Sequence, residues 1–352
     1  MTSATDLTRQ YDRWLASRIP VVEADVARKH EEMRADRFRF LRGTYYLWLA
    51  RVAERVPDVL DAARVPLVGD LHVENFGTWR DRDQTRRWGV NDYDELAVGP
   101  WLLDPLRLAV SARLAPHVAL GEDVELDTLL SSYAEAEAGA AIKLEGKRGE
   151  HLVDLVPAFA HERKFYQHLE EGAPADDVPA EVVAAATSVA EPGWKPRWFE
   201  HEAGTGSLGH LRRVGVGPAD DGGTHAREAK ELGPGSAVWA APIDRRMPTA
   251  DAGLFVRVMA QVKGPAAVVR VSDWHVRDLA PDVVRIELSG LHKGDARRLL
   301  GSMAEVTAAV HATDTAAYGR ARKEAAALDP ATFQQYVDAM VDVVRADHAS
   351  YR

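Results

Sequence analysis

The 352-residue sequence predicts an α+β protein of two lobes, in which a mainly helical lobe precedes a small lobe rich in β-strands. A length of roughly 150 residues per domain suggests about two such units. Apolar residues follow helical spacing up to about residue 190, give way to short Gly- and Val-rich runs, and return to helical spacing near the end. We therefore expect a helical lobe over residues 1–190, a β-rich lobe over 191–290, and C-terminal helices over 291–352 that pack on the first lobe.

Composition limits where the protein acts and on what. The formal net charge is −10, which argues against nucleic acid or anionic lipid as the main partner. The sequence has no cysteine, which excludes disulfide scaffolds, thiolate metal sites and cysteine nucleophiles. The first twenty residues lack the pattern of a signal peptide, and no apolar run reaches the roughly 18 residues of a membrane span. We expect a cytoplasmic protein with no membrane partner.

The first segment begins with helices and two short strands. Residues 20–58 predict two successive helices with a break at Ala35–Asp36. The apolar runs Val65–Val68 and Trp88–Val90 predict the two strands of a hairpin. Helical spacing resumes over residues 104–114 and 123–147.

The later segments combine short strands with longer helices. A connection that carries Pro and Trp, Glu191–Trp198, separates them from the first segment. Beyond it, Gly- and Val-rich runs predict antiparallel strands near residues 209–217, 225–232, 266–272 and 282–288. Helices are expected at residues 292–313 and 330–348.

Acidic and amide residues gather directly after the two predicted strands of the first segment. Asp70, His72, Glu74 and Asn75 follow one strand, and Asp92, Asp94 and Glu95 follow the other. Oxygen ligands of this kind at one edge of a sheet suit Mg²⁺ that is bound together with phosphate. Such residues also end strands and cap turns in most proteins, so neither loop alone indicates a function. The two loops together, bordered by glycines, favour a site.

The spacing within these loops favours phosphoryl transfer. Asp70 and Asn75 lie five residues apart, as do the catalytic Asp and the metal-binding Asn of the kinase catalytic loop, and Asp92 falls where that fold has its second metal-binding Asp. We therefore expect Asp70 to orient and deprotonate an acceptor hydroxyl. Asn75 and Asp92 are expected to hold Mg²⁺, and Asp94 to assist or to hold a second ion.

The segments Gly69–Gly77, Val90–Glu95 and Gly99–Ala109 resemble the aminoglycoside and choline phosphotransferase branch of the kinase-like fold. That branch reads H-G-D-x-H-x-x-N, then I-D-F-D or I-D-W-D, then G-D-P-x-x-D-L-A, and Val68 stands where it usually carries His. The resemblance implies that Asp104 supports the catalytic loop by accepting its backbone N–H groups. Asp104 is equally suited to cap the helix that follows it.

A cover for the triphosphate is expected in the later segment. A G-x-G-x-x-G sequence enters a predicted strand there, and its glycines would let backbone N–H groups approach phosphate oxygens; the residues concerned are Gly204, Gly206, Ser207 and Gly209. The next predicted strand carries Lys230, where a kinase-like fold places the lysine that contacts the α- and β-phosphates. A hairpin turn and a solvated lysine would produce the same pattern.

Two features depart from the usual kinase order. No glutamate occurs between Glu231 and Glu287, so an acidic partner for Lys230 is absent or is Asp244, Asp251 or an earlier residue. The catalytic loop also precedes the glycine sequence and the lysine. We therefore expect a circularly permuted two-lobed kinase-like fold, with the catalytic lobe first.

Further segments resemble a family of bacterial proteins of unknown function catalogued as DUF2252. The resemblance extends over about residues 37–232, with a weaker match at Asp273–Leu279, and rests on Arg37–Tyr46, Val68–Gly77, Asn91–Glu95, Gly99–Ala109, Gly204–Gly209 and Arg227–Lys230. The family supplies no substrate, but it agrees with a kinase-like interpretation of the loops.

We therefore expect an ATP- and Mg²⁺-dependent phosphotransferase acting on an unidentified hydroxylated small molecule or protein. Two alternatives remain open. A catalytically inactive nucleotide-binding or scaffold protein is favoured by the missing partner of Lys230. A dimetal phosphoesterase would explain Gly69–His72 as a metal-binding G-D-x-H, although the other motifs of such enzymes are absent from the sequence. The sequence does not separate phosphoryl from nucleotidyl transfer and does not indicate an oligomeric state.

Overall fold

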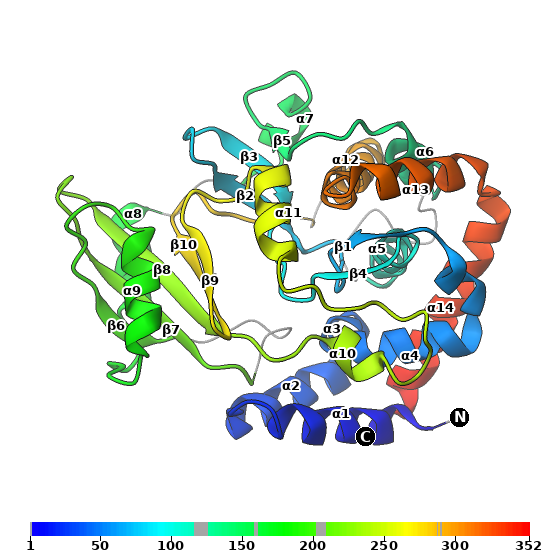
Figure 1. Ribbon diagram of the computed structural model, residues 1–352, viewed down its shortest axis with the longest axis horizontal. Helices are drawn as coiled ribbons and strands as arrows, with labels where there is room; N and C mark the ends of the chain where they lie inside the picture. The colour runs from blue at the N-terminus through cyan, green and yellow to red at the C-terminus, as the bar shows by residue number, and fades with distance from the viewer. Residues whose placement is uncertain (1, 116–125, 158–160, 202–208, 287, 289–290) are drawn as a thin grey trace.

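The computed structural model describes residues 2–115, 126–157, 161–201, 209–286, 288 and 291–352. These residues form a mixed α+β protein, as the sequence predicts. Figure 1 shows two bodies side by side, which we call the sheet lobe and the helical lobe. The sheet lobe is a five-stranded sheet with two helices packed on it, and the helical lobe is a larger group of helices around two smaller sheets.

Four helices begin the helical lobe: α1 (Ala4–Ala16), α2 (Glu23–Ala35), α3 (Arg37–Gly43) and α4 (Tyr45–Arg55). The expected break at Ala35–Asp36 is confirmed, because Asp36 is extended and its carboxylate accepts a hydrogen bond from the amide of Arg39 at 2.8 Å. Every residue from Tyr45 to Val52 is buried, so α4 runs through the core. The short 3₁₀ helix η1 (Pro57–Asp61) follows it.

The central helix of the helical lobe is α5 (Leu103–Leu114), in which only Arg113 is not buried. It contacts α6 (Leu126–Glu135), α12 (Lys293–His311) and α14 (Pro330–Ser350), and α13 (Thr315–Ala327) packs on α6 and α12. The two expected C-terminal helices are therefore confirmed. The helix expected to reach residue 147 ends at Glu135, because Ile142 and Lys143 pair with a strand instead.

Two small antiparallel sheets lie within the helical lobe. β1 (Arg64–Leu67) pairs with β4 (Ala97–Pro100), while β2 (Phe76–Arg80) pairs with β3 (Arg86–Val90) and β5 (Ile142–Lys143) extends that sheet. The expected hairpin between residues 65–68 and 88–90 is therefore wrong. The Asp81 carboxylate accepts hydrogen bonds from the amides of Asp83 and Thr85 and closes a turn between β2 and β3, which leaves β1 to pair with β4.

The sheet lobe contains β6 (Arg197–Glu200), β7 (Arg212–Pro218), β8 (Thr224–Glu231), β9 (Val268–Val271) and β10 (Trp274–Leu279), in the antiparallel order 6-7-8-10-9. The expected strands at 209–217 and 225–232 are thus confirmed. Helix α8 (Glu162–Leu169) packs with Val214 and Ala226, whereas α9 (Ala180–Ser188) packs with Ala229 and Val276. Because side chains alternate along a strand, the two helices cover opposite faces of the sheet.

Helices α10 (Ser236–Ala240) and α11 (Leu254–Val262) lie between β8 and β9 in the chain but pack into the core of the helical lobe. A short helix, α7 (Glu150–Val153), follows β5. Of the strand expected at 282–288, the described residues show only a bridge between Arg285 and Gly77.

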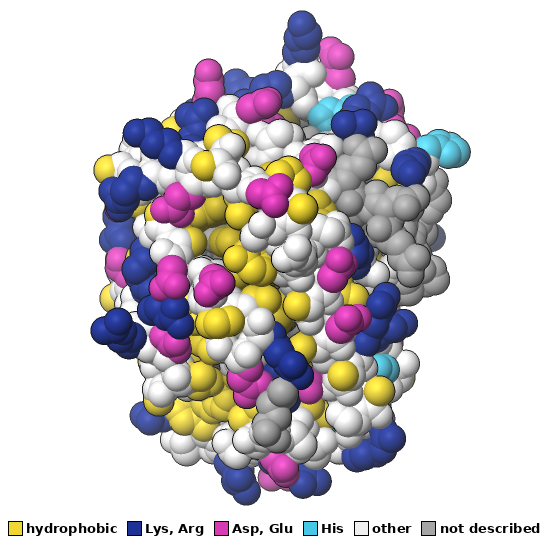
Figure 2. Space-filling model, turned by 90° about the vertical axis from the view of Figure 1, so that its right-hand side faces the viewer, with side chains coloured by type: hydrophobic (Ala, Val, Ile, Leu, Met, Phe, Trp, Pro, Cys, Tyr) yellow, Lys and Arg dark blue, Asp and Glu magenta, His cyan; other side chains and the backbone are white. Residues whose placement is uncertain are grey.

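The surface carries charges of both signs. On the face that Figure 2 turns toward the viewer, basic and acidic side chains surround a central stretch of hydrophobic ones. No helix within the described ranges is both long and apolar enough to cross a membrane.

Helix α11 offers a matched test of the packing. Val258 is fully buried in the core, whereas Val256 on the same helix is 71% exposed. We expect Val258→Ala to lower the free energy of unfolding by about 2 kcal/mol. Val256→Ala should change it by less than about 0.5 kcal/mol. Urea denaturation of both variants measures the difference, and equal effects would contradict the packing of α11.

Candidate functional site

The candidate site is a cleft where the loops after β1 and β3 meet the end of β8 and the start of α10. Five of the residues singled out in the sequence line this cleft, namely Asp70, Asn75, Asp92, Asp94 and Lys230. They come from both lobes and from positions up to 160 residues apart (230 − 70). The fold therefore brings together the two acidic loops and the lysine that the sequence could only place separately.

Asp104 supports the first loop from inside the core. Its carboxylate oxygens accept hydrogen bonds from the backbone amides of Val68 (2.7 Å) and Gly69 (3.1 Å), as the resemblance implies. The side chain is fully buried and also lies 3.0 Å from Nε2 of His311, whose Nδ1 lies 2.7 Å from the hydroxyl of Tyr133. Asp104 does not line the cleft and lies within α5 rather than at its cap.

Gly69 is required where the two acidic loops touch. Its φ is +95°, and a Cβ atom at this position would lie 2.4 Å from the backbone oxygen of Glu95. Both the left-handed backbone and the close approach exclude a side chain. The loop that carries Asp70 is thereby held directly against the loop that carries Asp92.

Asp70 is oriented by a buried arginine. Nε of Arg107 donates a hydrogen bond to Oδ1 of Asp70 at 2.8 Å, and a terminal nitrogen of the same guanidinium binds that oxygen as well. Arg107 is itself fully buried, with its guanidinium 4.9 Å from the ring of Tyr45 and 5.2 Å from that of Trp48. Burial raises the pKa of Asp70, although Arg107 opposes the shift.

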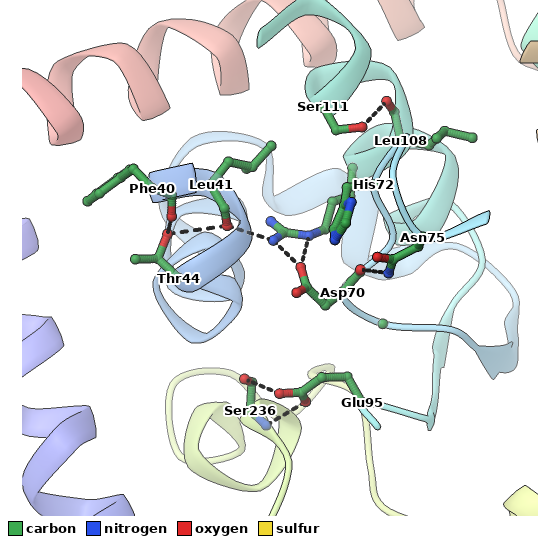
Figure 3. Close-up of polar contacts among 12 residues, drawn as sticks. Phe40, Leu41, Thr44, Asp70, His72, Asn75, Glu95, Leu108, Ser111 and Ser236 are labelled. Atoms are coloured by element: carbon green, nitrogen blue, oxygen red, sulfur yellow. Dashed lines mark hydrogen bonds and ion pairs between the residues drawn. The ribbon is translucent and has the colours of Figure 1, made fainter. Parts of the chain in front are cut away.

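Arg107 was not among the site residues predicted from the sequence. The signal was its place on the same helix as Asp104, three residues later, where the two side chains project from one face of α5 toward the same loop. In Figure 3 the Asp70 carboxylate points toward the helix that carries Leu41, and Asn75 lies on the other side of Asp70.

Asn75 and Asp92 each keep an oxygen available for a ligand. The side-chain amide nitrogen of Asn75 donates to the backbone oxygen of Asp70 at 2.5 Å, which leaves Oδ1 as an acceptor. Oδ1 of Asp92 accepts a hydrogen bond from the amide of Asp94 at 3.2 Å, and Oδ2 has no hydrogen bond to any residue in the described parts of the chain.

These two oxygens fit Mg²⁺, which proteins commonly hold through one or two carboxylates together with phosphate and water. Over the ranges that the structure describes, no group of three or more His, Cys, Asp or Glu side chains is arranged to bind a metal.

Asp94 supplies the acidic partner of Lys230. The ammonium group of Lys230 binds Oδ2 of Asp94, and Nδ1 of His275 lies 3.5 Å from Oδ1. Burial alone would raise the pKa of Asp94, but Lys230 and His275 outweigh it and hold that pKa well below its ordinary value. The partner thus comes from earlier in the chain, one of the possibilities that the sequence left open, and from the acidic loop itself.

Glu95 and Lys29 also line the cleft. Glu95 belongs to the second acidic cluster of the sequence, where no role was predicted for it. Glu95 accepts hydrogen bonds from the amide (2.7 Å) and the hydroxyl (2.8 Å) of Ser236 at the start of α10, and burial raises its pKa to about 7. Figure 3 shows Glu95 and Ser236 across the cleft from Asp70. Lys29 comes from α2, and nothing in the sequence around it marks it as a site residue.

His72 is a structural residue of the first loop. It is buried, its Nδ1 accepts a hydrogen bond from the amide of Glu74 at 3.2 Å, and burial keeps its pKa well below the ordinary value. The neutral imidazole of His72 accepts a hydrogen bond from the backbone and so stabilises the loop. His72 does not line the cleft.

Most of the glycine sequence lies outside the described residues, which include neither Gly204, Gly206 nor Ser207. Gly209 is described and has a φ of +99°. Its backbone oxygen accepts a hydrogen bond from the amide of Val22 at 3.1 Å, just before α2. Arg212 pairs with Lys230 across the sheet, so β7 begins at the same end of the sheet as the lysine.

Removing the Asp104 carboxylate tests its supporting role. Asp104→Ala would leave the amides of Val68 and Gly69 buried without acceptors, so we expect the free energy of unfolding to fall by about 3 kcal/mol. The control Asp127→Ala, at an exposed position in the first turn of α6, should change it by less than about 0.5 kcal/mol. Urea denaturation measures both. A cost of Asp104→Ala as small as that of the control would contradict the role.

Comparison with known proteins identifies only part of the chain. No curated protein and no solved structure is significantly similar to it. A family model matches a stretch that covers both acidic loops and Asp104 but stops before Lys230. Residues 18–144 match the family described as an uncharacterized protein conserved in bacteria, DUF2252.

Proposed function

We propose that the protein is an ATP- and Mg²⁺-dependent phosphotransferase of kinase-like fold in permuted order. One observation carries the proposal: a carboxylate suited to act as a base, two oxygen ligands and a lysine paired with an acid line one cleft, as Asp70, Asn75, Asp92 and Lys230 with Asp94. Phosphoryl transfer requires these groups together, because it needs an oriented hydroxyl and compensation of the phosphate charges.

Each group would have a defined part in the reaction. The acceptor oxygen attacks the γ-phosphorus, the bond from that phosphorus to the β–γ bridging oxygen breaks, and ADP leaves with the electron pair. The proton of the acceptor hydroxyl passes to the carboxylate of Asp70, which Arg107 holds in position. Asn75 and Asp92 would hold Mg²⁺, which would offset the charge on the phosphate oxygens. Lys230 would contact the α- and β-phosphates.

The sheet lobe supports the kinase-like part of the proposal. Lys230 lies on the third strand of an antiparallel sheet in chain order, β8, and the G-x-G-x-x-G sequence falls between the first and second strands, β6 and β7. The acidic partner of Lys230 is present, so the observation that favoured an inactive scaffold no longer does so. The acceptor is a hydroxylated small molecule or a protein.

Calorimetric titration with ATP tests nucleotide binding. We expect the wild-type protein to bind ATP in the presence of Mg²⁺ and at least about tenfold more weakly without it, because Asn75 and Asp92 need the ion to contact phosphate. Asp92→Ala should abolish the effect of Mg²⁺, and the control Asp127→Ala should bind as the wild type does. Absence of ATP binding by the wild-type protein would overturn the proposed function.

The role of Asp70 is separable from binding. Asp70→Asn keeps an acceptor for Arg107 but cannot take up a proton, so we expect ADP production from ATP to fall by at least about 100-fold. Binding of MgATP should stay within about twofold of wild type, since Asp70 acts on the acceptor. Turnover measured by ADP release and binding measured by calorimetry give the two values. Unchanged turnover would remove Asp70 from the chemistry.

A further inference from the structure

Lys29 is a cation in the cleft for which the described residues supply no partner. It lines the cleft together with Asp70, Glu95 and Lys230, yet its ammonium group makes no hydrogen bond or ion pair with any residue that the structure describes. Burial lowers the pKa of Lys29, and the carboxylates of Asp12, Asp70 and Glu95 oppose the shift. A partly buried ammonium group without a counter-ion costs free energy, and an anionic ligand would remove that cost.

The helix that carries Lys29 is held on both sides of it. Before Lys29, the amide of Val22 donates to the oxygen of Gly209, and a Cβ on Gly209 would lie 3.0 Å from Val26. After it, Met33 packs so closely on Gly43 that a Cβ there would lie 2.7 Å from its sulfur. The same Cβ would lie 3.3 Å from Cε of Lys29, so Gly43 also leaves the space that the lysine side chain occupies.

The position of Lys29 in the cleft suggests which part of the substrate it contacts. Lys29 lines the same cleft as both Asp70 and Lys230, and the charges of both act on it, as does that of Asp12. Under the proposed function, the acceptor oxygen lies at Asp70 and the α- and β-phosphates lie at Lys230. A cation in the same cleft as both would lie beside the space through which the γ-phosphoryl group passes.

We propose that Lys29 binds the oxygens of the transferring γ-phosphoryl group, so that helix α2 completes the active site. The inference rests on the proposed function and adds to it a residue from outside both acidic loops and the sheet lobe. Negative charge on the γ-phosphoryl oxygens would provide the counter-ion that the described residues do not supply to Lys29, and the ammonium group would hold these oxygens in line for attack.

Comparison of MgATP with MgADP tests the assignment, because only the former carries the γ-phosphate. We expect Lys29→Met to weaken MgATP binding by about tenfold and to leave MgADP binding within about twofold. Lys29→Arg should retain at least half of the discrimination between the two nucleotides. The control Lys164→Met removes an exposed lysine on α8 and should bind both nucleotides as the wild type does.

The outcomes distinguish a failure of the proposed function from a failure of the role of Lys29. If the wild-type protein binds neither nucleotide, the proposed function fails and the inference with it. If the wild type binds MgATP but Lys29→Met binds both nucleotides as tightly, or weakens both equally, the assignment of Lys29 to the γ-phosphoryl group is overturned while the function stands. Thermal unfolding of Lys29→Met and of the more conservative Lys29→Gln separates loss of binding from loss of fold, since the assignment requires the selective loss in a folded variant.

Discussion

The buried carboxylate of Asp104 is the interaction on which the geometry of the site depends. A charge in the core must be compensated by hydrogen bonds, and the amides of Val68 and Gly69 provide two of them. Satisfying Asp104 therefore fixes the backbone immediately before Asp70. His311 contacts the same carboxylate from α12, so this helix is joined to the loop through one side chain. The position of Asp70 thus depends on packing deep in the helical lobe, and Arg107 on the same helix fixes its side chain.

A second compensated charge joins the two lobes. Lys230 belongs to the sheet lobe and Asp94 to the helical lobe, and each is largely shielded from solvent in their ion pair. The side chains of Lys230, His275, Glu228 and Arg277 share one face of the sheet, because β8 pairs with β10 in a register that places Lys230 opposite His275 and Glu228 opposite Arg277. The polar end of this face meets the acidic loops, and its apolar end is covered by α8. The alternation of side chains along β8 thus decides that the lysine faces the cleft.

The sequence predicted the residues whose pattern is local. Asp70, Asn75 and Asp92 stand at fixed spacings after apolar runs. Because each loop is short, these residues also stay close to the ends of those runs in the folded protein. The pairing of strands that lie far apart in the chain could not be predicted from such local patterns. The hairpin prediction failed because the apolar run at Val65 could pair with any strand of suitable pattern. The turn at Asp81 pairs β3 with β2, which leaves β1 to pair with β4. Lys29 was missed for the same reason, since only the docking of α2 on Gly43 and Gly209 brings it to the cleft.

The net charge of the whole chain did not predict the net charge of the cleft. The charged side chains that line the cleft are three cations and four acids, a balance of 3 − 4 = −1 when all are ionised: Lys29, Arg42, Lys230, Asp70, Asp92, Asp94 and Glu95. Adding their ion-pair partners outside the cleft, Arg107 and Glu74, gives 4 − 5 = −1. A polyphosphate is not attracted by such a balance. A divalent cation at Asn75 and Asp92 would reverse its sign to +1, so attraction of an anionic substrate would depend on the metal. The negative charge of the acidic loops would then favour anion binding indirectly, because it attracts a divalent cation whose charge is larger than the net negative charge of the cleft.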